Sequence, residues 1–260
     1  MKLKLTIEYA GTRYSGWQVQ KNARTIQGEI QAAIRETGAQ RFEIYGSGRT
    51  DAGVHALAQV AHLDIDSSLP PDTLRRRIND NLPADINVLR IERVRHRFHA
   101  RHDAVARSYL YQIARRRTAF GKAYVWWVKD ALDLGAMRLT AARFVGMHDF
   151  QAFSDDDPDE KSTQALVDTL DLHERGDLLL VHIEGSHFLW KMVRRLVGVL
   201  VEVGRGGLDV DAAAALLEGP SPLPARLTAP ASGLFLERVY YPGDPRHLPV
   251  EPFLALRPYA

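Results

Sequence analysis

A glycine-rich stretch at residues 46–55, GSGRTDAGVH, carries the side chains of this sequence most suited to chemistry. It sets a guanidinium at Arg49 and a carboxylate at Asp51, and both project to the same side if the backbone is extended. A positive neighbour favours the ionised carboxylate, which keeps a nucleophile or base available near neutral pH. The same spacing also fits an ordinary surface ion pair, worth about 0–1 kcal/mol.

Several other kinds of site are excluded by the sequence. Asp51 stands where a dinucleotide fingerprint needs glycine, and the Gly-Lys-Ser/Thr ending of a P-loop is absent. The chain has no cysteine, which excludes disulfides, thiolate metal sites and a cysteine nucleophile. His96, His99 and His102 have a spacing that suits zinc, but the arginines between them oppose a dication, so we expect no metal.

Arginine is concentrated in one part of the chain. Residues 90–117 contain nine arginines and two acidic residues, although the formal net charge of the whole chain is only +2. Such a segment is typical of a surface that binds a polyanion, because each neutralised phosphate releases counterions. A solvated surface strip has the same composition and remains the alternative.

Hydrophobic patterning predicts the elements that must position these residues. Residues 3–9 alternate as in a half-buried strand, and an apolar stripe at helical spacing follows Thr25, a typical helix N-cap residue. Strands and helices mix without strict βαβ alternation, so we expect an α+β fold with an antiparallel or mixed sheet. The other predicted strands are residues 56–65, 86–94, 107–114, 178–183 and 236–241, and the other predicted helices are residues 134–145, 188–203 and 209–217.

The strand predicted at residues 107–114 also carries reactive groups. Arg107, Tyr109 and Tyr111 alternate along it, so we expect the three side chains to share a surface. A tyrosine in such a strand is more often a packing residue than a catalyst. Elsewhere, the acidic residues 155–160, DDDPDE, are predicted to form a loop.

The string GSGRTDAGVHALAQVAH at residues 46–62 resembles the signature of the TruA-type tRNA pseudouridine synthases, a glycine-rich segment that contains the nucleophilic aspartate. Shorter blocks that are similar to the family follow in the same order, from about Leu3 to Tyr241. They include Gly16-Trp17-Gln18, Thr25-Ile26-Gln27, Asn81-Leu82-Pro83, Phe98-His99-Ala100-Arg101, His148-Asp149-Phe150, Met192-Val193-Arg194 and Ala229-Pro230.

The resemblance implies roles for individual residues. It makes Asp51 the nucleophile or base that acts on a uridine, and it attributes extrusion of the target nucleotide to Arg49. Tyr109 takes the place of the tyrosine that stacks on the uracil, to which removal of the C5 proton is also attributed. Arg194 matches the basic residue that pairs with the aspartate, and Leu234 matches the apolar residue that lines the base pocket.

The resemblance also implies an architecture. It predicts two similar halves of mixed α/β structure with joined, mainly antiparallel sheets and a basic central cleft that holds Asp51. We expect an N-terminal half at residues 1–104, a C-terminal half at residues 105–245 and an extended tail at residues 246–260. Arg101 and Arg107 are expected to bind the RNA.

One block departs from the family pattern. After Phe153, relatives carry a serine or threonine followed by an arginine, whereas residues 155–160 of this chain are acidic. Because acidic groups repel phosphate, we expect this loop to point away from bound RNA.

The implied activity is isomerisation of uridine to pseudouridine at positions 38 to 40 of the tRNA anticodon stem-loop, carried out by a homodimer. The reaction involves no redox change and no external group, so no cofactor is expected. The N-terminus lacks an uninterrupted apolar stretch, which favours a cytoplasmic protein without a membrane partner. Two alternatives are a catalytically inactive RNA-binding or RNA-chaperone module and a hydrolase that releases free uracil.

Overall fold

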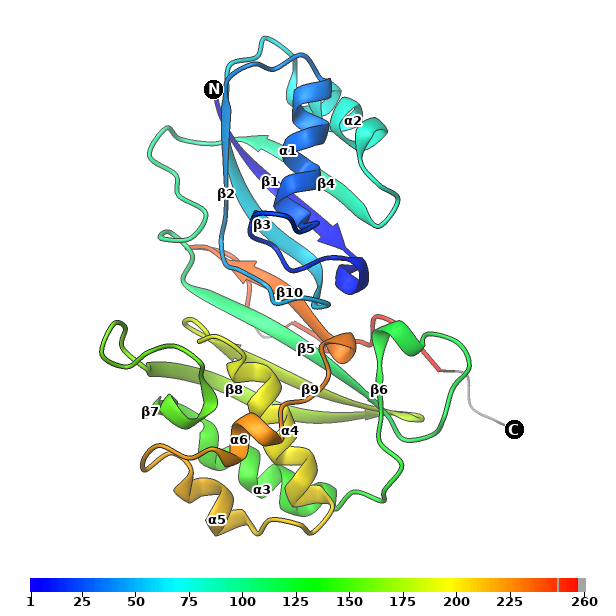
Figure 1. The fold of residues 1–260 in the computed structure, drawn as a ribbon, viewed down its shortest axis with the longest axis vertical. Coiled ribbons are helices and arrows are strands. Elements are labelled where there is room, and N and C mark those ends of the chain that lie inside the picture. Colours follow the sequence, from blue (N-terminus) through cyan, green and yellow to red (C-terminus); the bar gives the residue numbers. More distant parts are fainter. Residues whose placement is uncertain (247, 257–260) are drawn as a thin grey trace. The chain divides into compact units, whose positions relative to one another are not determined.

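The computed structural model describes residues 1–246 and 248–256, and the chain divides into two units (Figure 1). Unit 1 comprises Met1–Val105 together with Phe235–Arg246. Unit 2 comprises Ala106–Leu234 with the described residues of the C-terminal tail. Each unit combines helices with a sheet in which antiparallel pairs predominate, so the predicted α+β class is confirmed.

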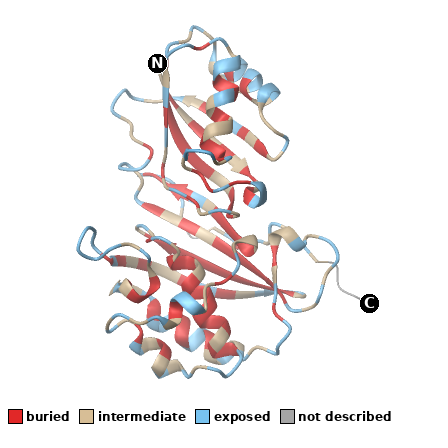
Figure 2. Ribbon diagram, in the orientation of Figure 1, coloured by how far each residue is buried: buried red, intermediate tan, exposed pale blue. Residues whose placement is uncertain are grey.

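The sheet of unit 1 is built around β3 (His55–Ile65). Along one edge β3 pairs antiparallel with β1 (Lys2–Tyr9), which in turn pairs antiparallel with β4 (Ile86–Arg93). Two strands share the other edge of β3. Its C-terminal half pairs antiparallel with β2 (Phe42–Gly46), and its first residues pair parallel with β10 (Leu234–Tyr240). Alternate residues of β1 are buried, as the sequence pattern predicted (Figure 2).

Two helices lie on one face of this sheet, α1 (Ile26–Glu36) and α2 (Pro71–Asn81) (Figure 1). The Thr25 hydroxyl accepts a hydrogen bond from the first turn of α1, which confirms the predicted cap. The hydrophobic pattern of the sequence did not predict α2. Only Leu74 and Ile78 are buried in it, and two apolar residues among charged ones give a weak helical pattern.

In unit 2, β5 (Ala106–Ala114) pairs antiparallel with β9 (Leu178–Gly185). The antiparallel order continues through β8 (Gln164–Arg175) to β7 (Gly146–Asp149), and the short β6 (Trp126–Trp127) pairs parallel with β5. The hydrophobic pattern of the sequence did not predict β8. A register shift between two of its residues, a bulge, breaks the period-two pattern that would have revealed the strand.

The helices of unit 2 are α3 (Leu134–Phe144), α4 (Met192–Gly204), α5 (Val210–Ala215) and α6 (Leu223–Arg226). The helix predicted at residues 188–203 was wrong at its start. Lys191 has φ 64° and ψ 0°, a left-handed conformation that cannot lie inside an α-helix, and α4 therefore begins at Met192. Side chains cap the two flanking helices: Asp133 caps α3, and Asp209, which was predicted to be the first residue of its helix, is instead the cap of α5.

The described part of the tail contains no helix or strand and contacts β5 and β8 of unit 2. The backbone N–H of Phe253 donates to the side-chain oxygen of Gln112 at 2.8 Å, and Arg175 donates to the carbonyl of Val250 at 3.2 Å. Among the residues that the structure describes, no helix combines the length and the apolar character needed to cross a bilayer.

Candidate active site

The loop that carries Asp51 joins β2 to β3 and is fixed to β3 along its first half. The backbone N–H of Ser47 donates to the carbonyl of Val60 at 2.7 Å. The Ser47 hydroxyl donates to Oε1 of Gln59 at 2.7 Å, and Nε2 of Gln59 donates to the carbonyl of Gly48 at 3.2 Å. Because Ser47 and Gln59 are both buried, water competes little for these hydrogen bonds.

The residue before Asp51 is held from two further directions. Thr50 is buried, and its hydroxyl lies 2.8 Å from the hydroxyl of Tyr9 on β1. Its carbonyl accepts a hydrogen bond from the backbone N–H of Trp17 at 3.0 Å. The position of the backbone at Asp51 is therefore set by segments far away in the sequence.

A tight turn follows Asp51. Its carbonyl accepts a hydrogen bond from the N–H of Val54 at 3.2 Å, and the third residue of the turn, Gly53, has φ 79°. A type II turn requires such a positive φ at this position, which glycine adopts without strain. The Gly53 N–H donates to the carbonyl of Tyr14 at 3.2 Å, so the turn is tied to the N-terminal segment as well.

Two glycines allow that N-terminal segment to approach the loop. A Cβ on Gly16 would lie 2.5 Å from the carbonyl oxygen of Thr50, and a Cβ on Gly11 would lie 1.9 Å from that of Val54. The Gly11 N–H also donates to Nδ1 of the buried His55 at 3.1 Å. In the sequence, Gly16 stands out only through its family likeness, and Gly11 does not stand out at all, because contacts across such a separation leave no local pattern.

The loop presents a carboxylate and a guanidinium at different depths. Asp51 is half-buried, whereas Arg49 is exposed, and the buried Thr50 lies between them. This alternation is what extended backbone produces. A half-buried carboxylate on a loop fixed by so many hydrogen bonds can act repeatedly in one geometry, as a nucleophile or base must.

In unit 2, β5 presents Arg107 and Tyr109, both half-buried. Arg107 donates to the carbonyl of Ser186 at 2.8 Å. The ring of Tyr109 meets the ring of Phe188 edge-on, with centroids 5.2 Å apart. The strand and the segment before α4 therefore fix the direction of the tyrosine ring.

Tyr111 follows on the same face of β5, because the pairing of β5 with β9 runs without a register shift, but its side chain is covered. Tyr111 is 1% exposed, and its hydroxyl donates to the carbonyl of Pro230 at 2.7 Å. A Cβ on Gly233 would lie 2.6 Å from the Tyr111 ring, so the segment that contains this glycine covers the ring closely. Burial raises the pKa of Tyr111 above its usual range, although the charge of Arg194 acts in the opposite direction.

Arg194 lies in the first turn of α4 and is half-buried. Its Nε donates to the carbonyl of Ala229 at 2.8 Å, and its own carbonyl accepts from the N–H of Ala229 at 3.0 Å. These two hydrogen bonds join the start of α4 to the Ala229-Pro230 block. Leu234, the first residue of β10, is buried.

Arg101 is exposed on the loop that follows β4, and its backbone N–H donates to Nδ1 of His99 at 3.2 Å. The His99 ring contacts two further histidines, with centroids 4.5 Å from His62 and 4.2 Å from His102, and His62 stacks on Tyr45 at 5.2 Å. The sequence analysis grouped His96 with these histidines and missed His62. In the described residues, no group of three or more histidine, cysteine, aspartate or glutamate side chains is arranged to hold a metal ion.

The arginine-rich segment at residues 90–117 runs through several elements and does not form one face of a single element. Some of its arginines are paired with acids: Arg90 with Glu92 at 2.8 Å, Arg115 with Glu174 at 2.9 Å and Arg116 with Asp177 at 2.6 Å.

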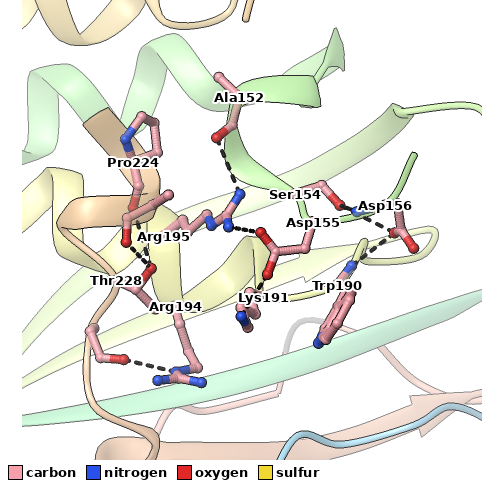
Figure 3. A network of polar contacts seen from close by, with 12 residues as sticks. Ala152, Ser154, Asp155, Asp156, Trp190, Lys191, Arg194, Arg195, Pro224 and Thr228 are labelled. Carbon is pink, nitrogen blue, oxygen red and sulfur yellow. Dashed lines mark hydrogen bonds and ion pairs between the residues drawn. The ribbon is translucent and has the colours of Figure 1, made fainter. Parts of the chain in front are cut away.

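The acidic loop contacts the start of α4 (Figure 3). Asp155 forms ion pairs with Lys191 at 2.5 Å and with Arg195, and Asp156 accepts a hydrogen bond from the N–H of Trp190 at 3.0 Å. Arg195 is 4% exposed because the helix turns it inward toward Asp155.

Comparison with known proteins gives one consistent family. A family model described as tRNA pseudouridine synthase matches residues 5–103 and 140–242. A Bacillus cereus protein named tRNA pseudouridine synthase A 2 is 41% identical over 241 residues, which is 92% of this chain and 98% of the relative. Proteins named tRNA pseudouridine synthase A from Citrifermentans bemidjiense and Rhodopseudomonas palustris are each 42% identical, over 97% and 99% of their own lengths and 92% of this chain.

Proposed function

Since the chain belongs to the tRNA pseudouridine synthase family and is thereby an isomerase acting on tRNA, we propose that it converts uridines at positions 38 to 40 of the anticodon stem-loop into pseudouridine, with Asp51 as the nucleophile or base. The observation that carries this proposal is the fixed loop around Asp51. Hydrogen bonds from Tyr9, Trp17 and Gln59 hold it, and its carboxylate is only half-buried.

The chemistry of the reaction requires such a group. The bond between the sugar C1′ and N1 of uracil breaks, and a bond between C1′ and C5 forms after the base has turned. Positive charge develops at the sugar as the first bond breaks, and a nearby carboxylate stabilises this charge or traps the sugar covalently, as in glycosidases. The C5 proton leaves and N1 gains a proton, so the overall change is an isomerisation that needs no oxidant and no cofactor.

The base must also leave its stack before it can react. A flipped pyrimidine is usually held by an aromatic platform and apolar contacts. We assign the platform to Tyr109, whose ring direction is fixed by Phe188. Leu234 supplies the apolar contact in this proposal, and Arg49, which is exposed, takes part in extruding the nucleotide.

The remaining cations complete the proposed assignment. Arg194 is the basic partner of the aspartate, and Arg101 and Arg107 bind the RNA backbone. Residues 1–104 then supply the reacting carboxylate, and residues 105–245 supply the groups that hold the base. The proposal also includes a homodimer that works on tRNA in the cytoplasm.

Release of tritium from tRNA labelled at C5 of uridine tests this function. The wild-type chain should release tritium without releasing uracil, and Asp51→Asn should reduce the rate by about 10⁴-fold or more while tRNA is still bound. Wild-type activity in Asp51→Asn would remove the proposed role of that carboxylate. Free uracil would identify a hydrolase, and tRNA binding without tritium release would identify an RNA-binding module.

A further inference from the structure

The helix that carries Arg194 begins in an unusual way. Lys191, directly before α4, has φ 64°, and no side-chain hydrogen bond caps the helix at this position. Left-handed backbone is disfavoured for a residue with a Cβ, so contacts from elsewhere must hold the chain in this conformation. Contacts from other segments therefore determine the position and orientation of the first turn of α4.

The acidic loop makes those contacts through the residue before Lys191. The N–H of Trp190 donates to the carboxylate of Asp156 at 3.0 Å, and the carbonyl of Trp190 accepts from the N–H of Asp155 at 3.3 Å (Figure 3). The Ser154 hydroxyl accepts from the N–H of Asp156 at 2.9 Å, which fixes the loop itself. Both polar groups of the Trp190 backbone are thereby satisfied by the loop.

Asp155 adds a charged link to the first turn of the helix. One carboxylate oxygen pairs with Nζ of Lys191 at 2.5 Å, and the other pairs with the guanidinium of Arg195. Arg195 is 4% exposed, and its guanidinium also donates to the carbonyl of Ala152 at 3.5 Å. Asp155 therefore places a negative charge beside a buried cation. Desolvation favours the protonated form of Asp155, but Lys191 and Arg195 outweigh this and hold the pKa of the carboxyl below its ordinary value.

The link fixes Arg194 as well. Successive side chains of an α-helix point about 100° apart, so fixing Arg195 toward the loop also fixes the direction of Arg194. Figure 3 shows Arg195 directed at Asp155 and Arg194 directed away from it. Nε of Arg194 donates instead to the carbonyl of Ala229. One turn further on, a Cβ on Gly198 would lie 1.8 Å from the carbonyl of Leu227, so there is little room for α4 to rotate against this segment.

We infer that Asp155 is a positioning residue, which holds the first turn of α4 through Lys191 and Arg195 so that Arg194 is presented in the orientation that the reaction needs. This inference rests on the proposed function, because that function gives Arg194 its role. It also gives the acidic loop, which departs from the family pattern, a role in the protein. The loop holds the start of α4 through intramolecular contacts and does not serve as an RNA contact.

The test measures kcat and KM for tRNA in Asp155→Asn by tritium release, with melting temperature as a check on folding. We expect kcat to fall by about tenfold or more and KM to change by less than about twofold. Asp159→Asn is the matched control, because it removes the same charge from an exposed position of the same loop. It should leave both constants within about twofold of the wild type. If the loop acts by repelling phosphate instead, both variants will lower KM to a similar degree, and the inference is overturned.

A double-mutant cycle shows whether the effect passes through Arg194. In an Arg194→Gln background, Asp155→Asn should lower kcat by less than about twofold, because the group that it positions is already gone. A loss as large as in the wild-type background would mean a general structural effect and would refute the inference. If Arg194→Gln alone keeps wild-type kcat, the proposed role of Arg194 is refuted. That outcome is distinct from one that refutes only the positioning role of Asp155.

A second variant keeps the test decisive if Asp155→Asn does not fold. Arg195→Met removes the link from the helix side and leaves no buried cation behind, while Asp155 keeps its pair with Lys191. It should show the same fall in kcat at unchanged KM. A folded Arg195→Met with wild-type kcat contradicts the inference.

Discussion

The hydroxyl groups of Tyr9 and Thr50 lie 2.8 Å apart in the interior of unit 1 and join β1 to the residue that precedes Asp51. Removal of one partner leaves the other with a lost hydrogen bond in a buried position, so Tyr9→Phe should lower the free energy of unfolding by about 1–2 kcal/mol. Denaturant titration measures this. Tyr45→Phe is the control, because its exposed hydroxyl bonds to Glu43 at the surface, and it should change stability by less than about 0.5 kcal/mol. Equal losses in the two variants would contradict a special role for the buried pair.

Gly16 and Gly38 offer a matched pair for testing the close approach to the loop. Both have positive φ, 93° and 91°, but a Cβ on Gly16 meets the carbonyl of Thr50 at 2.5 Å, whereas a Cβ on Gly38 meets nothing within 4 Å. Gly38→Ala should cost only the backbone strain, about 1 kcal/mol. Gly16→Ala should cost about 2 kcal/mol more and should also lower kcat, because the backbone before Asp51 must move. Similar stability and activity in the two variants would contradict this prediction, because they would show that the backbone at Thr50 moves at little cost in free energy.

His62 should make the fold sensitive to acid. Burial, aided by the charges of His99 and Lys2 and opposed by Asp64 and Asp103, lowers the pKa of His62 from 6.5 to about 4. Between these values an unfolded histidine binds a proton that folded His62 does not, so the unfolding free energy falls as the pH drops from 6.5 toward 4. The loss should be about 3 kcal/mol, and it should be absent above pH 6.5.

Urea titrations at several pH values check this dependence. His62→Gln should flatten the slope between pH 6.5 and 4, because glutamine keeps an acceptor for the N–H of Ala100 but does not titrate. Replacement of the exposed His96 by glutamine should leave the slope as it is. An unchanged slope in His62→Gln would assign the acid sensitivity to other groups.

Two variants of Tyr109 distinguish a role in stacking on the base from a role in proton transfer. Tyr109→Phe keeps an aromatic ring against Phe188, so tRNA binding should stay near wild type, while kcat should fall by about 100-fold if the hydroxyl takes part in removing the C5 proton. Tyr109→Ala should lose both binding of the base and turnover. Wild-type kcat in Tyr109→Phe would restrict this residue to stacking.

Local patterns in the sequence predicted those elements whose signals lie within a few residues. The cap at Thr25 and the alternation of β1 were both confirmed, because each depends only on residues that are close together in the sequence. The strand β8 was missed because its bulge interrupts the period on which prediction depends.

The support of the candidate site could not be read from the sequence in the same way. Asp51 and Arg49 were found from residue types on one short loop. Their anchors, Tyr9 and Gly11, come from distant segments, and only folding brings them to the loop. The pairing of Asp155 with the buried Arg195 was missed for the same reason, because the two residues lie 40 positions apart in the sequence.

Unit 1 is discontinuous in sequence, and this sets the order in which a ribosome can complete it. Phe235–Arg246 belongs to unit 1, yet the whole of Ala106–Leu234 must be synthesised first. Until then β3 lacks its partner β10, and an open strand edge of this kind invites pairing with other chains. At about 5–20 residues per second this interval lasts on the order of ten seconds. Nascent chains halted after Val105 should therefore be cleaved by protease far faster than chains that extend past Arg246. The addition of β10 then completes unit 1, although most of this unit is synthesised first.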